Sequence, residues 1–67
     1  MIEKHGGLYY QVFFSPDDGG HYSEVFNGSG QELHVTEVFD TSREATWAAQ
    51  NWINSKKKGT VVSHGTN

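Results

Sequence analysis

The sequence predicts an α+β fold, in which a three-stranded antiparallel meander is followed by one α-helix packed on one sheet face. Two observations lead to this fold class. Residues 8–39 contain three runs with strand-like alternation, and clusters of Pro, Asp, Asn and Gly separate them. A single run with helical periodicity follows, and a capping motif precedes it. The chain has 67 residues, which predicts one small domain with an ordered core over about 8–62 and flexible tails at 1–6 and 64–67.

The first predicted strand, over residues 8–15, is apolar on both faces. Strand side chains alternate, so one face receives Leu8, Tyr10, Val12 and Phe14, and the other receives Tyr9 and Phe13. The segment that follows, 16–20, begins with Pro and continues with Asp and Gly, which favour a hairpin turn. One helix covers only one face of such a strand, and the other face is left for a partner or for water.

The second and third strands are predicted at residues 21–26 and 31–39, with a turn at 27–30 between them. If the helix covers the Leu8 face, Val25 and the third-strand residues Leu33, Val35 and Phe39 are expected to join it. The opposite face then gathers Tyr9, Phe13, Tyr22 and Phe26. A register slip of one residue would exchange the two faces, and the pattern alone leaves both registers open.

The helix begins with a capping box, because Thr41 is followed three residues later by Glu44. Small and apolar side chains then recur with helical spacing at Ala45, Ala48, Ala49, Trp52 and Ile53. Three lysines at 56–58 suit the negative end of the helix dipole, and Gly59 is predicted to end the helix. Residues 60–63 are a candidate for a short fourth edge strand.

Trp47 lies opposite the small-residue stripe of the predicted helix. Arg43 comes one turn before it and Asn51 one turn after it. An exposed Trp next to Arg and Asn has the composition of a protein-interface hot spot. The alternative is that Trp47 folds back over its own helix or under Val61 and Val62. Helical phase does not separate the two.

Catalytic and metal-binding motifs are not found in the sequence. The four His residues lie in separate predicted elements and the chain has no Cys, so we expect no metal site, no cofactor and no catalytic residues. The net charge is −3 and the acids are spread along the chain, which is unlike a nucleic-acid-binding surface. No signal-peptide pattern or membrane-spanning run occurs, and a cytoplasmic protein is expected.

Two resemblances to known families add to this interpretation. One is to the HicB-type antitoxin domain, over about residues 8–55, in the residues Tyr9, Tyr10, Val12, Asp17, Asp18, Gly19, Gly20, Tyr22, Thr41, Glu44 and Ala45. That resemblance implies a sheet-and-helix fold that binds and blocks a small toxin ribonuclease. The junction Phe39, Thr41, Glu44 and Ala45 is similar to the three-strand-plus-helix domains of the AP2 and integrase-arm type. Those domains read DNA with the free face of their sheet.

The sequence therefore predicts a small non-catalytic module that acts by occupying a protein partner, as an inhibitor, an antitoxin-like regulator or an accessory subunit. A homodimer is the first expectation, because a second copy would cover the surplus aromatic residues. The expected partner-binding residues are Tyr9, Phe13, Tyr22, Phe26, Arg43, Trp47 and Asn51. The alternative function is a nucleic-acid-binding domain that uses the free sheet face.

Overall fold

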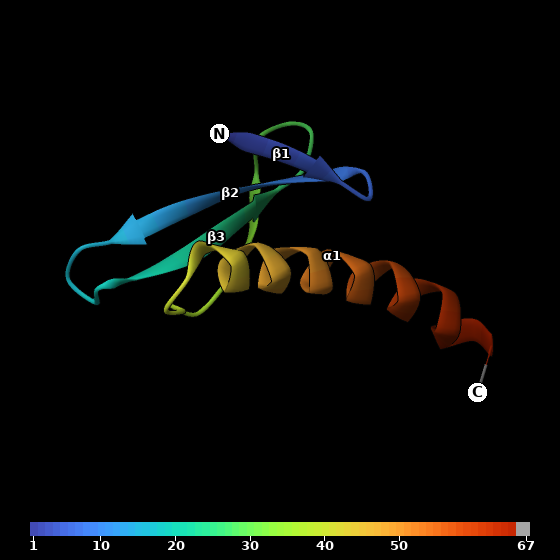
Figure 1. Cartoon of the computed structure of the whole chain (residues 1–67). Helices are drawn as coiled ribbons and strands as arrows, with labels where there is room; N and C mark the ends of the chain where they lie inside the picture. The colour runs from blue at the N-terminus through green and yellow to red at the C-terminus, as the bar shows by residue number, and fades with distance from the viewer. Residues whose placement is uncertain (66–67) are drawn as a thin grey trace.

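The protein is described by a computed structural model, which covers the backbone of residues 1–65 and the side chains of residues 1–56. Its elements are β1 (Ile2–His5), β2 (Leu8–Ser15), β3 (Gly20–Phe26), β4 (Glu32–Val35) and α1 (Ser42–Gly65). The strands form one antiparallel sheet in the order β1-β2-β3-β4, and α1 lies across one face of it (Figure 1). The predicted α+β class is confirmed.

The hairpin between β2 and β3 forms where the turn residues predict it. Ser15 pairs with Gly20, and the amide of Gly19 donates to the carbonyl of Ser15 at 2.8 Å. Gly19 has a φ of 69°, a conformation that glycine adopts without a steric cost. The Ser15 hydroxyl also donates to Asp18 Oδ2 at 2.9 Å, which further stabilises the turn.

The fourth strand of the sheet is β1, at the N-terminus, and not residues 60–63. Residues 2–5, expected in a flexible tail, pair with β2 through a two-residue turn at Gly6 and Gly7. These glycines have φ values of 55° and 85°, as a type I′ hairpin turn requires. The side chains of β1 are mostly exposed, so β1 is held by main-chain pairing more than by burial.

The strand predicted at 31–39 is shorter in the structure, because its register slips twice. Leu33 is an extra residue in β4, since Val25 pairs with His34 while Phe26 pairs with Glu32. Beyond β4, the amide of Ser23 donates to Thr36 Oγ1 at 2.9 Å instead of to a main-chain carbonyl. His21 then pairs with Phe39, one residue later than the register of β4 predicts.

These slips correct the expected facing of the third strand. Val35 pairs with Glu24 and is 43% exposed, and Leu33 is 38% exposed, so neither joins the core beneath the helix. His34 takes the helix-facing position instead and stacks on Trp52 at 4.7 Å between ring centroids. Phe39 does reach the helix side, where it lines a groove next to α1.

The capping box at the start of α1 is confirmed. The amide of Glu44 donates to Thr41 Oγ1, and the amide of Thr41 donates to Glu44 Oε1, both at 3.2 Å. The predicted end at Gly59 is wrong, because the helical backbone continues to Gly65. A glycine ends a helix when it turns left-handed, whereas inside the helix it only lowers stability. Residues 64–65, which were expected in a flexible tail, therefore belong to α1. Residues 66–67 of that tail lie outside the described part of the chain.

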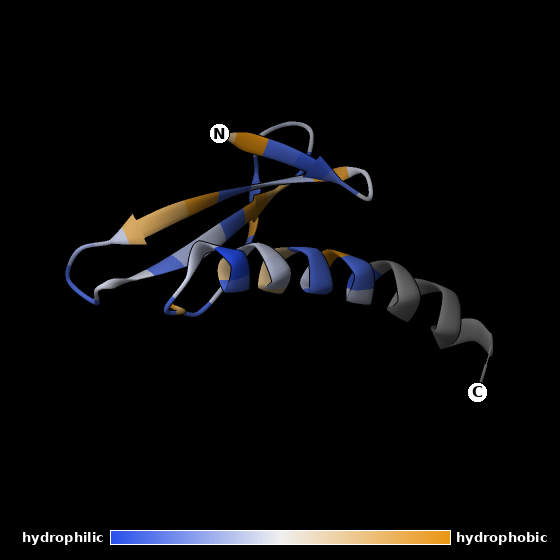
Figure 2. Cartoon of the chain, in the orientation of Figure 1, coloured by the Kyte–Doolittle hydropathy of each residue, from blue (hydrophilic) through white to orange (hydrophobic). Residues whose placement is uncertain are grey.

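The core lies between α1 and the β2–β3 pair. Tyr10, Val25, Ala49 and Ile53 are buried together, and Ala49 and the buried Ala45 let the helix approach the sheet closely. Figure 2 shows the apolar stretches of β2 and β3 and the mixed polarity of α1. Gln50 Nε2 donates to Tyr10 Oη at 2.9 Å across this layer. Over the described residues, no helix combines the length and apolar character needed to cross a bilayer.

Candidate functional site

The uncovered face of the sheet carries two cross-strand aromatic pairs. Tyr9 pairs with Phe26 and Phe13 pairs with Tyr22, as the predicted alternation requires. The Phe13 and Tyr22 rings are stacked, with centroids 5.5 Å apart and planes 25° apart. All four side chains are half-buried, although no helix in the described part of the chain covers them. We call these four residues the aromatic sheet face, and the predicted gathering of their side chains on one face is confirmed.

Charged and polar residues border the aromatic sheet face. Lys4, on β1, places its Nζ 5.9 Å from the centroid of the Tyr9 ring. Gln11 and Glu24 form the cross-strand pair between the two aromatic pairs, and Glu32 lies opposite Phe26. The β1 side of this face is therefore cationic, and the β3–β4 side is acidic.

A hollow of about 270 Å³ opens at one end of the aromatic sheet face. It is lined by Ile2, Tyr9, Phe26 and the β3–β4 turn residues Asn27, Gly28 and Gly30. Asn27 holds this turn, because its Oδ1 accepts from the amides of Ser29 and Gln31 at 3.0 Å each. Ile2 is 58% exposed at the rim. The hollow is thus mainly apolar in its walls and is bounded on one side by a hydrogen-bonded turn, which suits an anchoring side chain of a partner.

The predicted helix patch lies on a different surface of the molecule. Trp47 is 64% exposed, which favours the exposed alternative over a Trp that folds back on its own helix. The side chains of Val61 and Val62, which the other alternative involves, lie outside the described residues. Trp47 and Asn51 line a depression of about 240 Å³ together with Phe39, Glu44 and Ala48. Arg43 is exposed but does not line this depression. Because α1 covers the opposite side of the sheet, the seven predicted binding residues divide between two separate surfaces.

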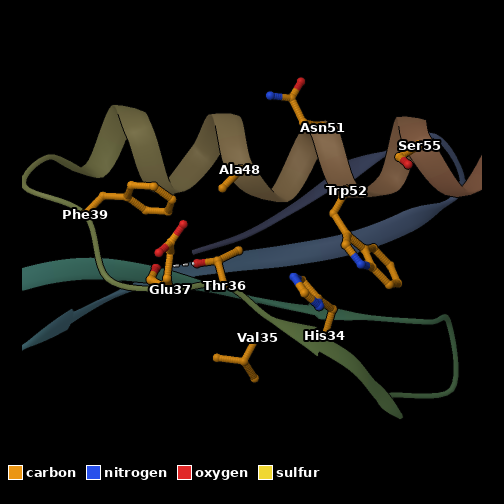
Figure 3. Close-up of a pocket in the computed structure, with 9 residues that line it drawn as sticks. All are labelled: His34, Val35, Thr36, Glu37, Phe39, Ala48, Asn51, Trp52 and Ser55. Carbon is orange, nitrogen blue, oxygen red and sulfur yellow. Dashed lines mark hydrogen bonds between the residues drawn. The ribbon is translucent and has the colours of Figure 1, made fainter.

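A larger groove, of about 430 Å³, lies between α1 and the segment that begins with β4 (Figure 3). We call it the α1–β4 groove. One wall is formed by His34, Val35, Thr36, Glu37 and Phe39, and the other by Ala48, Asn51, Trp52 and Ser55. Sequence reasoning missed this groove, because it depends on the early end of β4. A regular strand through residue 39 would have left no irregular wall for it.

Buried contacts hold the irregular wall in place. Ser23 is fully buried, and its hydroxyl donates to the carbonyl of Ala45 at 2.6 Å, which ties β3 to the first turn of α1. The carbonyl of Ser23 also accepts a hydrogen bond from the amide of Thr36 at 2.9 Å. The main chain of Ser23 therefore holds Thr36, and with it one wall of the α1–β4 groove, while the buried Ser23 hydroxyl ties the same residue to α1.

Among the described residues, no three His, Cys, Asp or Glu side chains lie close enough together to hold a metal ion. Glu44 lines the depression beside Trp47, and its carboxylate also accepts a hydrogen bond from the Thr41 hydroxyl at the start of α1. His21 Nδ1 is buried and has no hydrogen-bond partner among the described residues, and the ring is tilted against Phe14, with the ring centroids 5.3 Å apart. The features that stand out are two apolar surfaces on opposite sides of one sheet.

Comparison with known proteins finds no matching family model, no matching curated protein and no matching solved structure.

Proposed function

We propose that this protein is a small non-catalytic binding module that acts by occupying a protein partner, and that the aromatic sheet face is its main binding surface. The observation that supports this most directly is the pair of aromatic cross-strand contacts on a sheet face without a covering layer. A sheet with one apolar face in water normally gains a second layer, from its own chain or from a partner. Within the described residues, α1 packs on the other face.

A second copy of the chain is the partner that this face suits first. In face-to-face packing, a two-fold axis parallel to the strands places β1 of one copy over β4 of the other. Lys4 would then lie over the acidic side of the partner face, which carries Glu24 and Glu32. The aromatic pairs would meet in the centre, with both helices on the outside. The charges therefore favour self-association in this orientation.

The same charges favour a protein over nucleic acid as the partner. Lys4 is the only Lys or Arg that the strands present, and β3 and β4 contribute Glu24 and Glu32 on this face. Binding to a phosphate backbone relies on several cations that release counterions. Aromatic stacking alone would have to supply the affinity for a single strand. We therefore rank a nucleic-acid-binding function below protein binding.

Sedimentation equilibrium tests this proposal with two neighbouring substitutions. Phe13→Glu places a charge in the aromatic sheet face, and Phe14→Glu places the same charge on the opposite side of the same strand, where Phe14 is already 58% exposed. We expect the natural chain and Phe14→Glu to dimerise at micromolar concentration, and Phe13→Glu to weaken the dimer by about tenfold or more. A natural chain that stays monomeric at high micromolar concentration would refute self-association through this face.

A further inference from the structure

The α1–β4 groove has an edge strand as one wall. β4 is the last strand of the sheet over residues 1–65, so within this range one of its sides faces no other strand. The amide of Thr36 points to β3, since it donates to Ser23. Main-chain groups alternate in direction along an antiparallel strand, so the amide and carbonyl of Val35 point outward. The structure thus presents main-chain hydrogen-bonding groups directly beside an apolar groove.

The interior of the groove combines aromatic walls with a carboxylate. Phe39 lies at one end and Trp52 at the other, with Ala48 between them on the helix side (Figure 3). The Glu37 carboxylate extends toward the helix from the opposite wall. None of the described residues that line the groove is Lys or Arg, and the Nζ of Lys56 lies 5.2 Å from the centroid of the Trp52 ring, at the end away from Phe39. An aliphatic stem with a cationic end fits the Phe39 end of the groove, because the Phe39 ring contacts the stem and the Glu37 carboxylate pairs with the charge.

We propose that the α1–β4 groove binds an extended segment of a partner protein that adds to β4 as a fifth strand and places an Arg or Lys side chain between Phe39 and Glu37. Main-chain pairing with Val35 supplies affinity that does not depend on sequence, and the groove supplies selectivity for the basic side chain. The depression beside Trp47, which includes Glu44, continues the groove and extends its acidic character. The proposal does not rest on the aromatic sheet face, which lies on the other side of the sheet.

The test uses the full chain labelled with nitrogen-15 and a set of capped pentapeptides, Thr-Val-X-Val-Thr, in which X is Arg, Lys, Leu or Glu. We expect saturable NMR shifts for the Arg and Lys peptides at the amides of Val35 and Glu37 and at the indole of Trp52. The Glu peptide should bind at least about fivefold more weakly than the Arg peptide, as expected when charge attraction is replaced by repulsion. N-methylation of the peptide backbone should also weaken binding, because it removes the strand-pairing donors.

Two matched variants locate the site. Glu37→Gln should weaken binding of the Arg peptide by about fivefold, as for the loss of a partly exposed charge pair. Glu3→Gln removes a charge from an exposed position on β1, at the other edge of the sheet, and it should leave binding unchanged. The proposal is overturned if no peptide gives a saturable shift, if the Glu and Arg peptides bind equally, or if the shifts fall on the aromatic sheet face.

Discussion

Substitution of Ile53 by Ala should lower the free energy of unfolding by about 3–4 kcal/mol, the largest effect that we expect from a single change in this chain. Ile53 is fully buried, and it packs with Tyr10, Val25 and Ala49 in a core of few residues. Two of the other helix residues facing this core are alanines, Ala45 and Ala49, which cannot move into the space that Ile53 would leave. A domain of this size has little stability to lose, so much of the variant should be unfolded near 37 °C.

Trp47→Ala is the matched control, because it removes a larger side chain from the same helix at a position that is 64% exposed. It should change the free energy of unfolding by no more than about 0.5 kcal/mol. Urea titrations of both variants, followed by circular dichroism, measure the difference. If Trp47→Ala proves the more destabilising of the two, the helix does not pack with the phase described above, and the proposed surface around Trp47 is wrong as well.

Gly20→Ala is expected to have the next largest effect, a loss of about 2–3 kcal/mol. Gly20 is buried at the start of β3, and a Cβ atom there would lie 2.5 Å from both the carbonyl oxygen of Phe39 and Val38 Cγ1. The main chain at Phe39 cannot retreat without breaking its two 2.7 Å hydrogen bonds to His21. The irregular wall of the α1–β4 groove therefore needs a residue without a side chain at this position.

Gly28→Ala provides the control for Gly20→Ala, since an added Cβ at Gly28 has no atom within 4 Å. We expect Gly28→Ala to stay within about 0.5 kcal/mol of the natural chain. Thermal melts compare the stabilities, and the chemical shifts of Phe39 report whether the groove wall has moved. Equal melting temperatures for the two variants would show that residues 38–39 do not approach Gly20 as closely as the structure indicates.

The features of the fold that follow local rules could be predicted from the sequence. The capping box at Thr41 and Glu44 and the turn before Gly20 depend on nearby residues, and both formed as expected. The placement of Tyr9 and Phe13 on the opposite sheet face from Tyr10 could also be predicted, because it needs only the two-residue alternation of a strand. The sequence left two registers open, and in the structure Val25 is buried beside Tyr10 on the helix-covered face, which identifies the register that is present.

The features that depend on pairing with distant residues could not be predicted in the same way. β1 is mostly polar and mostly exposed, so no burial pattern marks it, and only the Gly6-Gly7 pair signalled a hairpin. β4 ends early because the amide of Ser23 donates to the Thr36 hydroxyl and not to a main-chain carbonyl. The alternation of apolar and polar residues does not reveal such a side-chain hydrogen bond. The α1–β4 groove depends on this hydrogen bond, and it was therefore not predicted.

α1 lies on one side of the sheet (Figure 1), and the α1–β4 groove is on that side, whereas the aromatic sheet face is on the other. A partner on one surface would therefore leave the other accessible. Dimerisation through the aromatic sheet face would place both α1–β4 grooves on the outside of the assembly. A dimer could then present two equivalent grooves to partner segments. Linked sites of this kind raise the apparent affinity for a partner that carries two such segments.

The measurement that tests the central claim most directly is an isotope-filtered NOE experiment on an equimolar mixture of labelled and unlabelled chains at high micromolar concentration. The claim is that the aromatic sheet face is the surface through which the protein associates. We predict intermolecular NOEs among the rings of Tyr9, Phe13, Tyr22 and Phe26 and between the side chains of Lys4 and Glu32. Intermolecular NOEs confined to Trp47 and the helix surface, or none at all from the four rings, would contradict the claim.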